Sequence, residues 1–263
     1  MIDMHNHLLF GVDDGPETIE ESLELIKEAT SRGVTHIIIT PHFNKRNNGL
    51  NHDKVSINFQ LLKEAIDKES IKIGLYLGNE VYMDSVGYAS IIDNGFNTLA
   101  GSRYLLVEFN EMMPPSNIPE ICYELTISGY IPIIAHAERY GILYNNSKLL
   151  GEILDEGAHL QVNASTIVNK ENHDRNKFAR YLLKNELVSF AASDVHNNTS
   201  RRFYLNEAYA AVCKLCSITY AYNIFKQNPM NIINNKKFES PKLPRATRQK
   251  GGRQQLINLL FRK

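Results

Sequence analysis

The sequence has little cysteine, no net charge and no long apolar run, and each absence excludes a class of protein. Its 263 residues hold three cysteines, Cys122, Cys213 and Cys216, too few for a disulfide framework in a chain of this size. No apolar run approaches the roughly 18 residues of a membrane-spanning helix. The first residues show neither the basic nor the apolar region of a secretory signal. We therefore expect a protein of the reducing cytoplasm.

The composition is that of an ordinary globular protein, with 43% hydrophobic and 22% charged residues, which argues against a disordered or collagen-like chain. The 29 basic and 29 acidic residues are unevenly distributed, because nine Lys and Arg fall in residues 236–263 beside the single acidic residue Glu239. We predict one domain over residues 1–235, acidic overall, followed by an irregular basic tail over 236–263.

Short apolar runs alternate with amphipathic stretches along the domain. The predicted strands are residues 2–5, 34–40, 71–77, 104–109, 131–135, 159–162 and 187–192. The predicted helices are residues 17–32, 53–68, 118–128, 147–156, 173–184 and 205–216. In the first helix, Pro16 suits the first turn and Gly33 suits the C-terminal cap. The alternation predicts an α/β fold with a parallel sheet, open or closed into a barrel, and it stops past about Asn228.

The strand ends carry the residues that point to function. Six of the seven positions are imidazoles or carboxylates, spaced 27 to 38 residues apart: His7, His42, Glu80, Glu108, His136, Asn163 and Asp194. These spacings are βα-unit lengths. In a (β/α) barrel the C-terminal strand ends converge on one face, where active sites are built, so a closed seven-stranded sheet would bring these groups around a common centre.

Two pairs of candidate ligands lie two residues apart at strand ends. His5 and His7 point to the same side of a strand because its side chains alternate with period two, and Asp194 and His196 repeat this spacing. Two neutral imidazoles at one site suit a borderline divalent metal. The pair His5 and His7 alone is a weak motif, but together with the later strand ends it predicts a metal site.

Some of these residues have plausible structural roles instead. His42, after Thr40 and Pro41, could be a turn or capping residue. We interpret Glu80 and Glu108 as ligands, because a carboxylate in a hydrophobic strand is costly to bury unless it is paired or bound to a cation. Four other histidines are interpreted as structural or surface residues: His36, His52, His159 and His173.

Several motifs together resemble the polymerase-and-histidinol-phosphatase (PHP) superfamily. Within it, the chain resembles the bacterial manganese-dependent protein-tyrosine phosphatases of capsule and exopolysaccharide loci, from residue 1 to about 235. The motifs are Asp3-Met4-His5-Asn6-His7, Gly11-Val12-Asp13-Asp14-Gly15-Pro16, Thr40-Pro41-His42, Gly78-Asn79-Glu80, His136-Ala137-Glu138-Arg139-Tyr140 and Ser193-Asp194-Val195-His196.

The resemblance implies a distorted (β/α)₇ barrel, similar to a TIM barrel, that binds three divalent metals. By motif, the first metal would be held by His5, His7, Glu80 and Asp194, the second by Glu80, Glu108 and His136, and the third by Asp14, His42 and His196. Asp13 is the adjacent alternative to Asp14. Such a set suits manganese, which we expect, and also iron, cobalt, zinc or magnesium. Adjacent divalent cations would create a bridging hydroxide and neutralise a phosphoryl group under attack.

The resemblance also implies that Arg139 and Arg201 handle the phosphate, with Arg202 as the alternative to Arg201; guanidinium forks match phosphate oxygens. The implied substrate is the phosphotyrosine-bearing tail of a bacterial tyrosine autokinase that governs polysaccharide assembly. No nucleic-acid partner is expected. The kinase or the basic tail could bring the protein near a membrane, and a homo-oligomer remains open.

The sequence argues against several other functions. A thiol-based phosphatase is excluded because no Arg lies six residues after any cysteine. An amidohydrolase would have a bridging lysine and a further histidine where this chain has Glu108 and Asn163. Histidinol-phosphate hydrolysis and nuclease activity remain alternatives within the superfamily. A non-catalytic, metal-stabilised module that docks through the basic tail would need only about four ligands.

Overall fold

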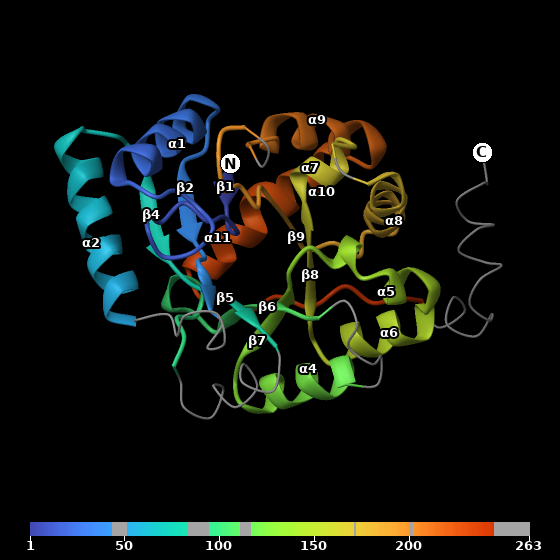
Figure 1. Ribbon diagram of the computed structural model, residues 1–263. Helices are drawn as coiled ribbons and strands as arrows, with labels where there is room; N and C mark the ends of the chain where they lie inside the picture. Colours follow the sequence, from blue (N-terminus) through green and yellow to red (C-terminus); the bar gives the residue numbers. More distant parts are fainter. Residues whose placement is uncertain (44–51, 84–94, 111–116, 171, 200–201, 245–263) are drawn as a thin grey trace.

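A computed structural model describes residues 1–43, 52–83, 95–110, 117–170, 172–199 and 202–244. The fold is α/β with parallel strands, as predicted, and helices surround the sheet (Figure 1). The strands are β1 (Ile2–Asp3), β2 (His36–Ile39), β3 (His42–Phe43), β4 (Gly74–Leu77), β5 (Glu80–Tyr82), β6 (Tyr104–Glu108), β7 (Ile131–Ile134), β8 (His159–Asn163) and β9 (Phe190–Ala192).

The sheet is divided in two, which the sequence did not predict. One part has the order β1-β2-β4 and the other the order β3-β5-β6-β7-β8-β9. The predicted strand 34–40 ends before Pro41, which has no N–H to donate to a ladder, and the chain resumes as β3. Between β4 and β5, a Cβ on Gly78 would lie 2.7 Å from Cδ2 of Leu99, so glycine permits the close approach of the short helix η1 (Leu99–Gly101).

The described strands form a curled, parallel half-barrel, which agrees with the distorted barrel that the resemblance implies. No ladder joins β9 to β1 among the described residues. Two backbone hydrogen bonds connect the segments that follow these strands instead, from Asp194 N to His5 O (3.0 Å) and from His7 N to Val195 O (2.9 Å). The first and last strands therefore meet at their C-terminal ends, where the predicted site lies.

The main helices lie close to their predicted bounds: α1 (Ile19–Ser31), α2 (His52–Lys68), α4 (Asn117–Ile127), α6 (Ser147–Asp155), α8 (His173–Lys184) and α9 (Leu205–Leu215). Shorter helices that were not predicted include η2 (Ala137–Arg139), α5 (Gly141–Asn145) and α7 (Ala164–Ile167). Helix α1 begins after Thr18, which forms a capping box with Glu21, so Pro16 lies outside its first turn. Gly33 follows the helix with a φ of +80°, a conformation that favours glycine.

The chain past α9 is more helical than its composition suggested. The segments α10 (Ile218–Tyr222), the π-helical η3 (Asn223–Gln227) and α11 (Asn228–Ile233) follow one another without a break. The βα alternation does stop here, but the segment, despite its asparagines, forms a helix with one buried face. Ile224, Phe225 and Ile232 lie on that face and are fully buried.

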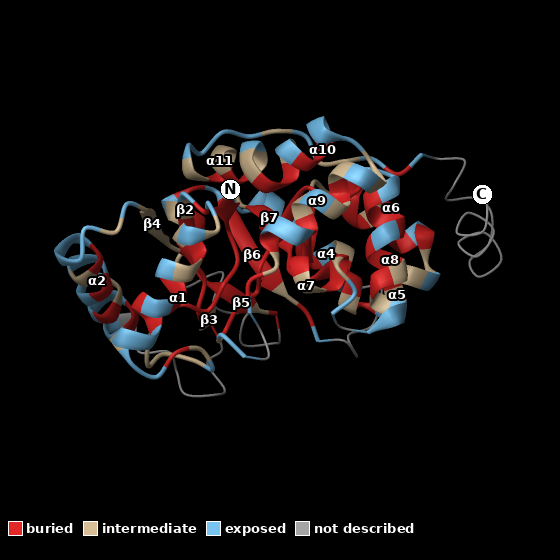
Figure 2. Ribbon diagram, turned by 90° about the horizontal axis from the view of Figure 1, so that it is seen from above, coloured by how far each residue is buried: buried red, intermediate tan, exposed pale blue. Residues whose placement is uncertain are grey.

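The core lies between the sheet and the inward faces of the helices, whose outer faces are exposed (Figure 2). Residues 236–244 have no regular secondary structure, yet the Phe238 ring packs 4.5 Å from that of His159 and Leu243 is buried. His159, predicted to be structural, is buried and lies within hydrogen-bond distance of the Ser189 hydroxyl (2.8 Å). Within the described ranges, no helix combines the length and apolar character needed to cross a membrane.

Candidate active site

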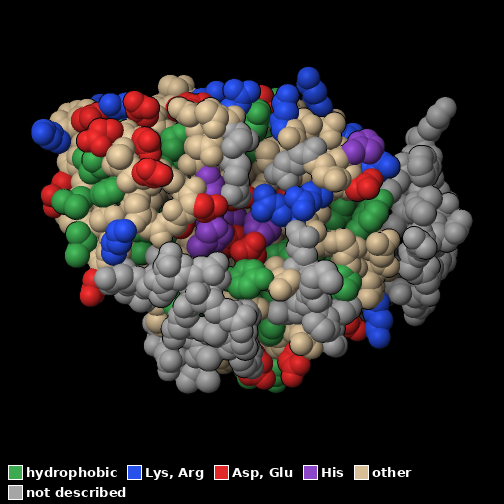
Figure 3. Space-filling view, viewed as in Figure 1, with side chains coloured by type: hydrophobic (Ala, Val, Ile, Leu, Met, Phe, Trp, Pro, Cys, Tyr) green, Lys and Arg blue, Asp and Glu red, His purple; other side chains and the backbone are tan. Residues whose placement is uncertain are grey.

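Histidine and acidic side chains gather at the centre of one face of the molecule, beside Lys and Arg side chains (Figure 3). The fold brings all nine predicted metal ligands together, since contacts of 3.7 Å or less link them into one network. They are His5, His7, Asp14, His42, Glu80, Glu108, His136, Asp194 and His196.

Glu80 lies at the centre of this cluster, at the start of β5. Its Oε1 is 3.3 Å from His5 Nε2 and 3.0 Å from His136 Nε2. Its Oε2 is 3.3 Å from His7 Nε2 and 3.1 Å from His42 Nδ1. One carboxylate, whose side chain is 1% exposed, thus faces four imidazoles from three segments of the chain.

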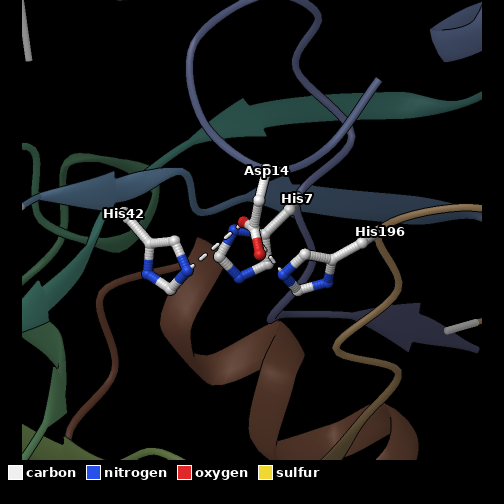
Figure 4. Close-up of side chains that lie close together, drawn as sticks. All are labelled: His7, Asp14, His42 and His196. Atoms are coloured by element: carbon white, nitrogen blue, oxygen red, sulfur yellow. Dashed lines mark ion pairs between the residues drawn. The ribbon is translucent and has the colours of Figure 1, made fainter. Parts of the chain in front are cut away.

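Asp13 and Asp14 have different surroundings. Asp14 Oδ1 lies 3.2 Å from His196 Nε2 and 3.5 Å from His42 Nε2, so its carboxylate sits between the two rings (Figure 4). Asp13 Oδ2 lies 2.7 Å from His7 Nδ1 and accepts a hydrogen bond from the backbone N–H of His42 (3.1 Å). Asp14 therefore faces the cluster, while Asp13 orients the ring of His7 from behind.

Asp194 is held on one side and faces the histidines with the other. Its Oδ2 accepts hydrogen bonds from Arg139 Nη2 (2.9 Å) and Asn163 Nδ2 (2.7 Å). Its Oδ1 lies 3.6 Å from both His5 Nε2 and His7 Nε2. The backbone of Asp194 is left-handed, with a φ of 52°, a conformation that costs energy for a non-glycine residue.

His136 and Glu108 complete the cluster on the side of β6 and β7. His136 Nε2 lies 3.4 Å from Glu108 Oε1. The sequence analysis missed Gln161, whose Oε1 accepts a hydrogen bond from the His136 N–H (2.7 Å) and lies 3.0 Å from His5 Nδ1. The sequence feature that could have indicated Gln161 is its place between Leu160 and Val162 in a predicted strand.

The acidic groups shift the protonation of their neighbours. Burial alone would lower the pKa of His5, but Glu80 and Asp194 raise it to about 9. Burial likewise opposes protonation of His42, and Asp14 and Glu80 raise its pKa to about 11. Burial and the neighbouring Glu80 raise the pKa of Glu108 to about 7. The cluster therefore attracts positive charge into a buried site.

This donor set fits divalent metals. Three groups each place ligand atoms within 4.8 Å of one another: His7, Asp14, His42 and His196; His5, His7 and Glu80; and His42, Glu80 and Glu108. His5 Nε2 and His7 Nε2 are buried and make no hydrogen bond within the described part of the chain. Imidazole nitrogens and carboxylate oxygens without thiolates suit manganese, iron or zinc. His136 and Asp194 lie beside these groups rather than within them.

Of the two predicted arginines, Arg139 lies at the cluster. Arg139, in η2, borders the cluster through Asp194, and its side chain is 18% exposed. Arg201 lies outside the described residues. Its alternative, Arg202, donates from Nε to the Tyr204 hydroxyl (3.0 Å) and lies 5.5 Å from that ring.

Comparison with known proteins decides the family. The family described as capsular polysaccharide synthesis, CpsB/CapC, matches residues 1–234. The chain belongs to the CpsB/CapC family. The tyrosine-protein phosphatase CpsB of Streptococcus agalactiae is 34% identical over 240 residues, which cover 89% of this chain and 99% of the relative.

Solved structures agree with this membership. A structure reported for YwqE from Bacillus subtilis and CpsB from Streptococcus pneumoniae, described as metal-dependent tyrosine phosphatases, matches with a TM-score of 0.85 and 28% identity. The match covers 93% of this chain and 99% of that one. Histidinol phosphate phosphatase from Lactococcus lactis, with zinc, histidinol and phosphate, matches with a TM-score of 0.56 and 17% identity, covering 85% of this chain and 94% of that chain. This last likeness shows a shared fold alone.

Proposed function

We propose that this protein is a metal-dependent protein-tyrosine phosphatase that removes phosphate from a bacterial tyrosine kinase of capsule or exopolysaccharide synthesis. The observation that carries the proposal is the buried carboxylate of Glu80 among four imidazoles, with Arg139 at the border of the cluster. Membership of the CpsB/CapC family, whose relatives carry the tyrosine-phosphatase name, supports the substrate class.

The residues suited to hold metal are the nine that the sequence predicted. Glu80 would be shared between two ions because each of its oxygens faces two imidazoles. Asp14, His42 and His196 would hold a further ion at the more exposed side. Bound divalent metals would neutralise the phosphoryl group and make water a better nucleophile. Manganese is the metal we expect.

Arg139 is suited to orient the phosphoryl group. Its Nη2 donates to Asp194, which fixes the guanidinium at the edge of the cluster. The planar fork can meet two phosphate oxygens at once. Asp194, a proposed metal ligand, accepts hydrogen bonds from both Arg139 and Asn163. The binding of phosphate and the binding of metal are therefore coupled through Asp194.

The substrate proposal can be tested by competition. The manganese-loaded protein is given a phosphotyrosine peptide, histidinol phosphate and single-stranded DNA in parallel, with phosphate or nucleotide release measured for each. We expect the highest kcat/KM on the phosphotyrosine peptide. A preference for histidinol phosphate or cleavage of DNA would overturn the substrate assignment, although either result would leave metal dependence in place.

A further inference from the structure

We propose that Gln161 is a positioning residue that sets the direction of a hydrogen-bond chain connecting three proposed metal ligands, a role that rests on the metal-dependent function proposed above. Gln161 lies in β8 between β7 and β9. It is fully buried, as is Asn163 two residues later on the same strand. Both side chains therefore point to the same side of the sheet.

The first part of this hydrogen-bond chain connects the His136 backbone to His5 through Gln161. The backbone N–H of His136 can only donate, so the atom of Gln161 that faces it at 2.7 Å must be the amide oxygen. The same oxygen lies 3.0 Å from His5 Nδ1 and can only accept. His5 must then carry a proton on Nδ1, which leaves Nε2 as the ring atom that a metal would bind. That Nε2 faces Glu80 and Asp194.

The second part of the chain runs from Gln161 to Asp194. Since Oε1 of Gln161 faces His5 and His136, its Nε2 must donate, and it does so to Asn163 Oδ1 (2.9 Å). The Asn163 amide then presents Nδ2, which donates to Asp194 Oδ2 (2.7 Å). Asp194 is left with Oδ1 directed at His5 and His7. Every step has only one allowed direction, because the His136 N–H fixes the first.

The hydrogen-bond chain through Gln161 therefore has three effects on the proposed metal ligands. It selects the ring tautomer of His5, holds the left-handed backbone of His136 (φ 32°) and aims Asp194. These residues follow β1, β7 and β9. Gln161, in β8, contacts His5 and His136 directly and Asp194 through Asn163. Outer partners of this kind fix the orientation of metal ligands, and their loss typically costs about 10- to 100-fold in metal affinity or activity.

The test replaces the acceptor without changing the size of the side chain much. Gln161→Leu removes both the oxygen and the N–H groups. Gln161→Glu keeps an oxygen toward His5 and His136 but loses the N–H that donates to Asn163. Asn176→Leu is the matched control, because Asn176 is also buried and donates to two backbone carbonyls, those of Thr166 and Ile167, outside the cluster. The full-length proteins are stripped with a chelator and titrated with Mn²⁺ against a fluorescent competitor, and the melting temperature is recorded without metal.

We expect Gln161→Leu to bind Mn²⁺ about 10- to 100-fold more weakly, with Gln161→Glu closer to wild type and Asn176→Leu unchanged. Wild-type affinity in Gln161→Leu, or an equal loss in Asn176→Leu, overturns the proposal. Equal losses in the Leu and Glu variants would overturn it too, because the acceptor would then be irrelevant. A wild-type protein that binds Mn²⁺ without hydrolysing phosphotyrosine contradicts the proposed function but leaves this comparison valid.

Discussion

Replacing Glu80 should damage the site more than replacing any carboxylate at its rim. Glu80 faces four imidazoles at 3.0 to 3.3 Å and its side chain is 1% exposed, whereas Asp14 faces two at 3.2 and 3.5 Å and its side chain is 57% exposed. Water can take the place of the Asp14 carboxylate, but it cannot easily reach the position of Glu80. We therefore expect Glu80→Gln to lose metal from both positions that share this carboxylate.

The kinetic cost should follow the same order. We expect kcat/KM on a phosphotyrosine peptide to fall by at least about 10³-fold in Glu80→Gln, about 4 kcal/mol of transition-state stabilisation. The fall in Asp14→Asn should be about 10- to 100-fold. The assay measures bound metal by elemental analysis and kcat/KM on the same preparations. Full metal occupancy in Glu80→Gln, or a larger loss in Asp14→Asn, would refute the shared position of Glu80.

Three further changes test separate parts of the structure. Arg139→Lys keeps the charge but loses the fork, so kcat should fall about 10²-fold, roughly 3 kcal/mol, with bound metal intact; normal kcat would remove Arg139 from catalysis. Burial and Lys237 lower the pKa of His159 to about 3, so the folded protein keeps this ring neutral, and stability is lost as pH falls below about 6.5. Between pH 7.5 and 5.5, wild type should lose about 1.4 kcal/mol more unfolding free energy than His159→Gln, and parallel pH profiles would contradict this. Thr18→Ala removes the α1 cap and should cost about 1 kcal/mol, seen as a melting temperature about 2 to 4 °C lower with unchanged kcat; an unchanged melting temperature would count against the cap.

The sequence could predict the strands and the site because both follow from regular spacing. His5 and His7 alternate on one strand, and Glu80 and Glu108 are carboxylates in apolar surroundings, so their convergence follows from a parallel sheet. The capping box of Thr18 and Glu21 was also readable, yet Pro16 was preferred as the start of the helix because proline is common in a first turn. Local rules of this kind compete, and only the packed helix decides between them.

The parts that could not be predicted depend on contacts between distant segments. At the break between β4 and β5, Leu99 packs closely against Gly78, a contact between distant residues that no local pattern predicts. The helical segment after α9 was not predicted because asparagine and proline are unfavourable inside a helix, whereas the buried side chains of Ile224, Phe225 and Ile232 stabilise it through packing. Gln161 was missed because its role depends on His5 and His136, which follow β1 and β7 and meet it only in the folded protein.

The most direct test of the central claim is metal-restored hydrolysis of phosphotyrosine. The full chain is stripped with a chelator, the chelator is removed, and phosphate release from a phosphotyrosine peptide is followed before and after Mn²⁺ is added back, with Glu80→Gln treated identically. The account predicts that stripped wild type is inactive, that Mn²⁺ restores its activity, and that Glu80→Gln stays inactive. Full activity of the stripped protein, or no activity on phosphotyrosine with Mn²⁺ bound, would contradict it.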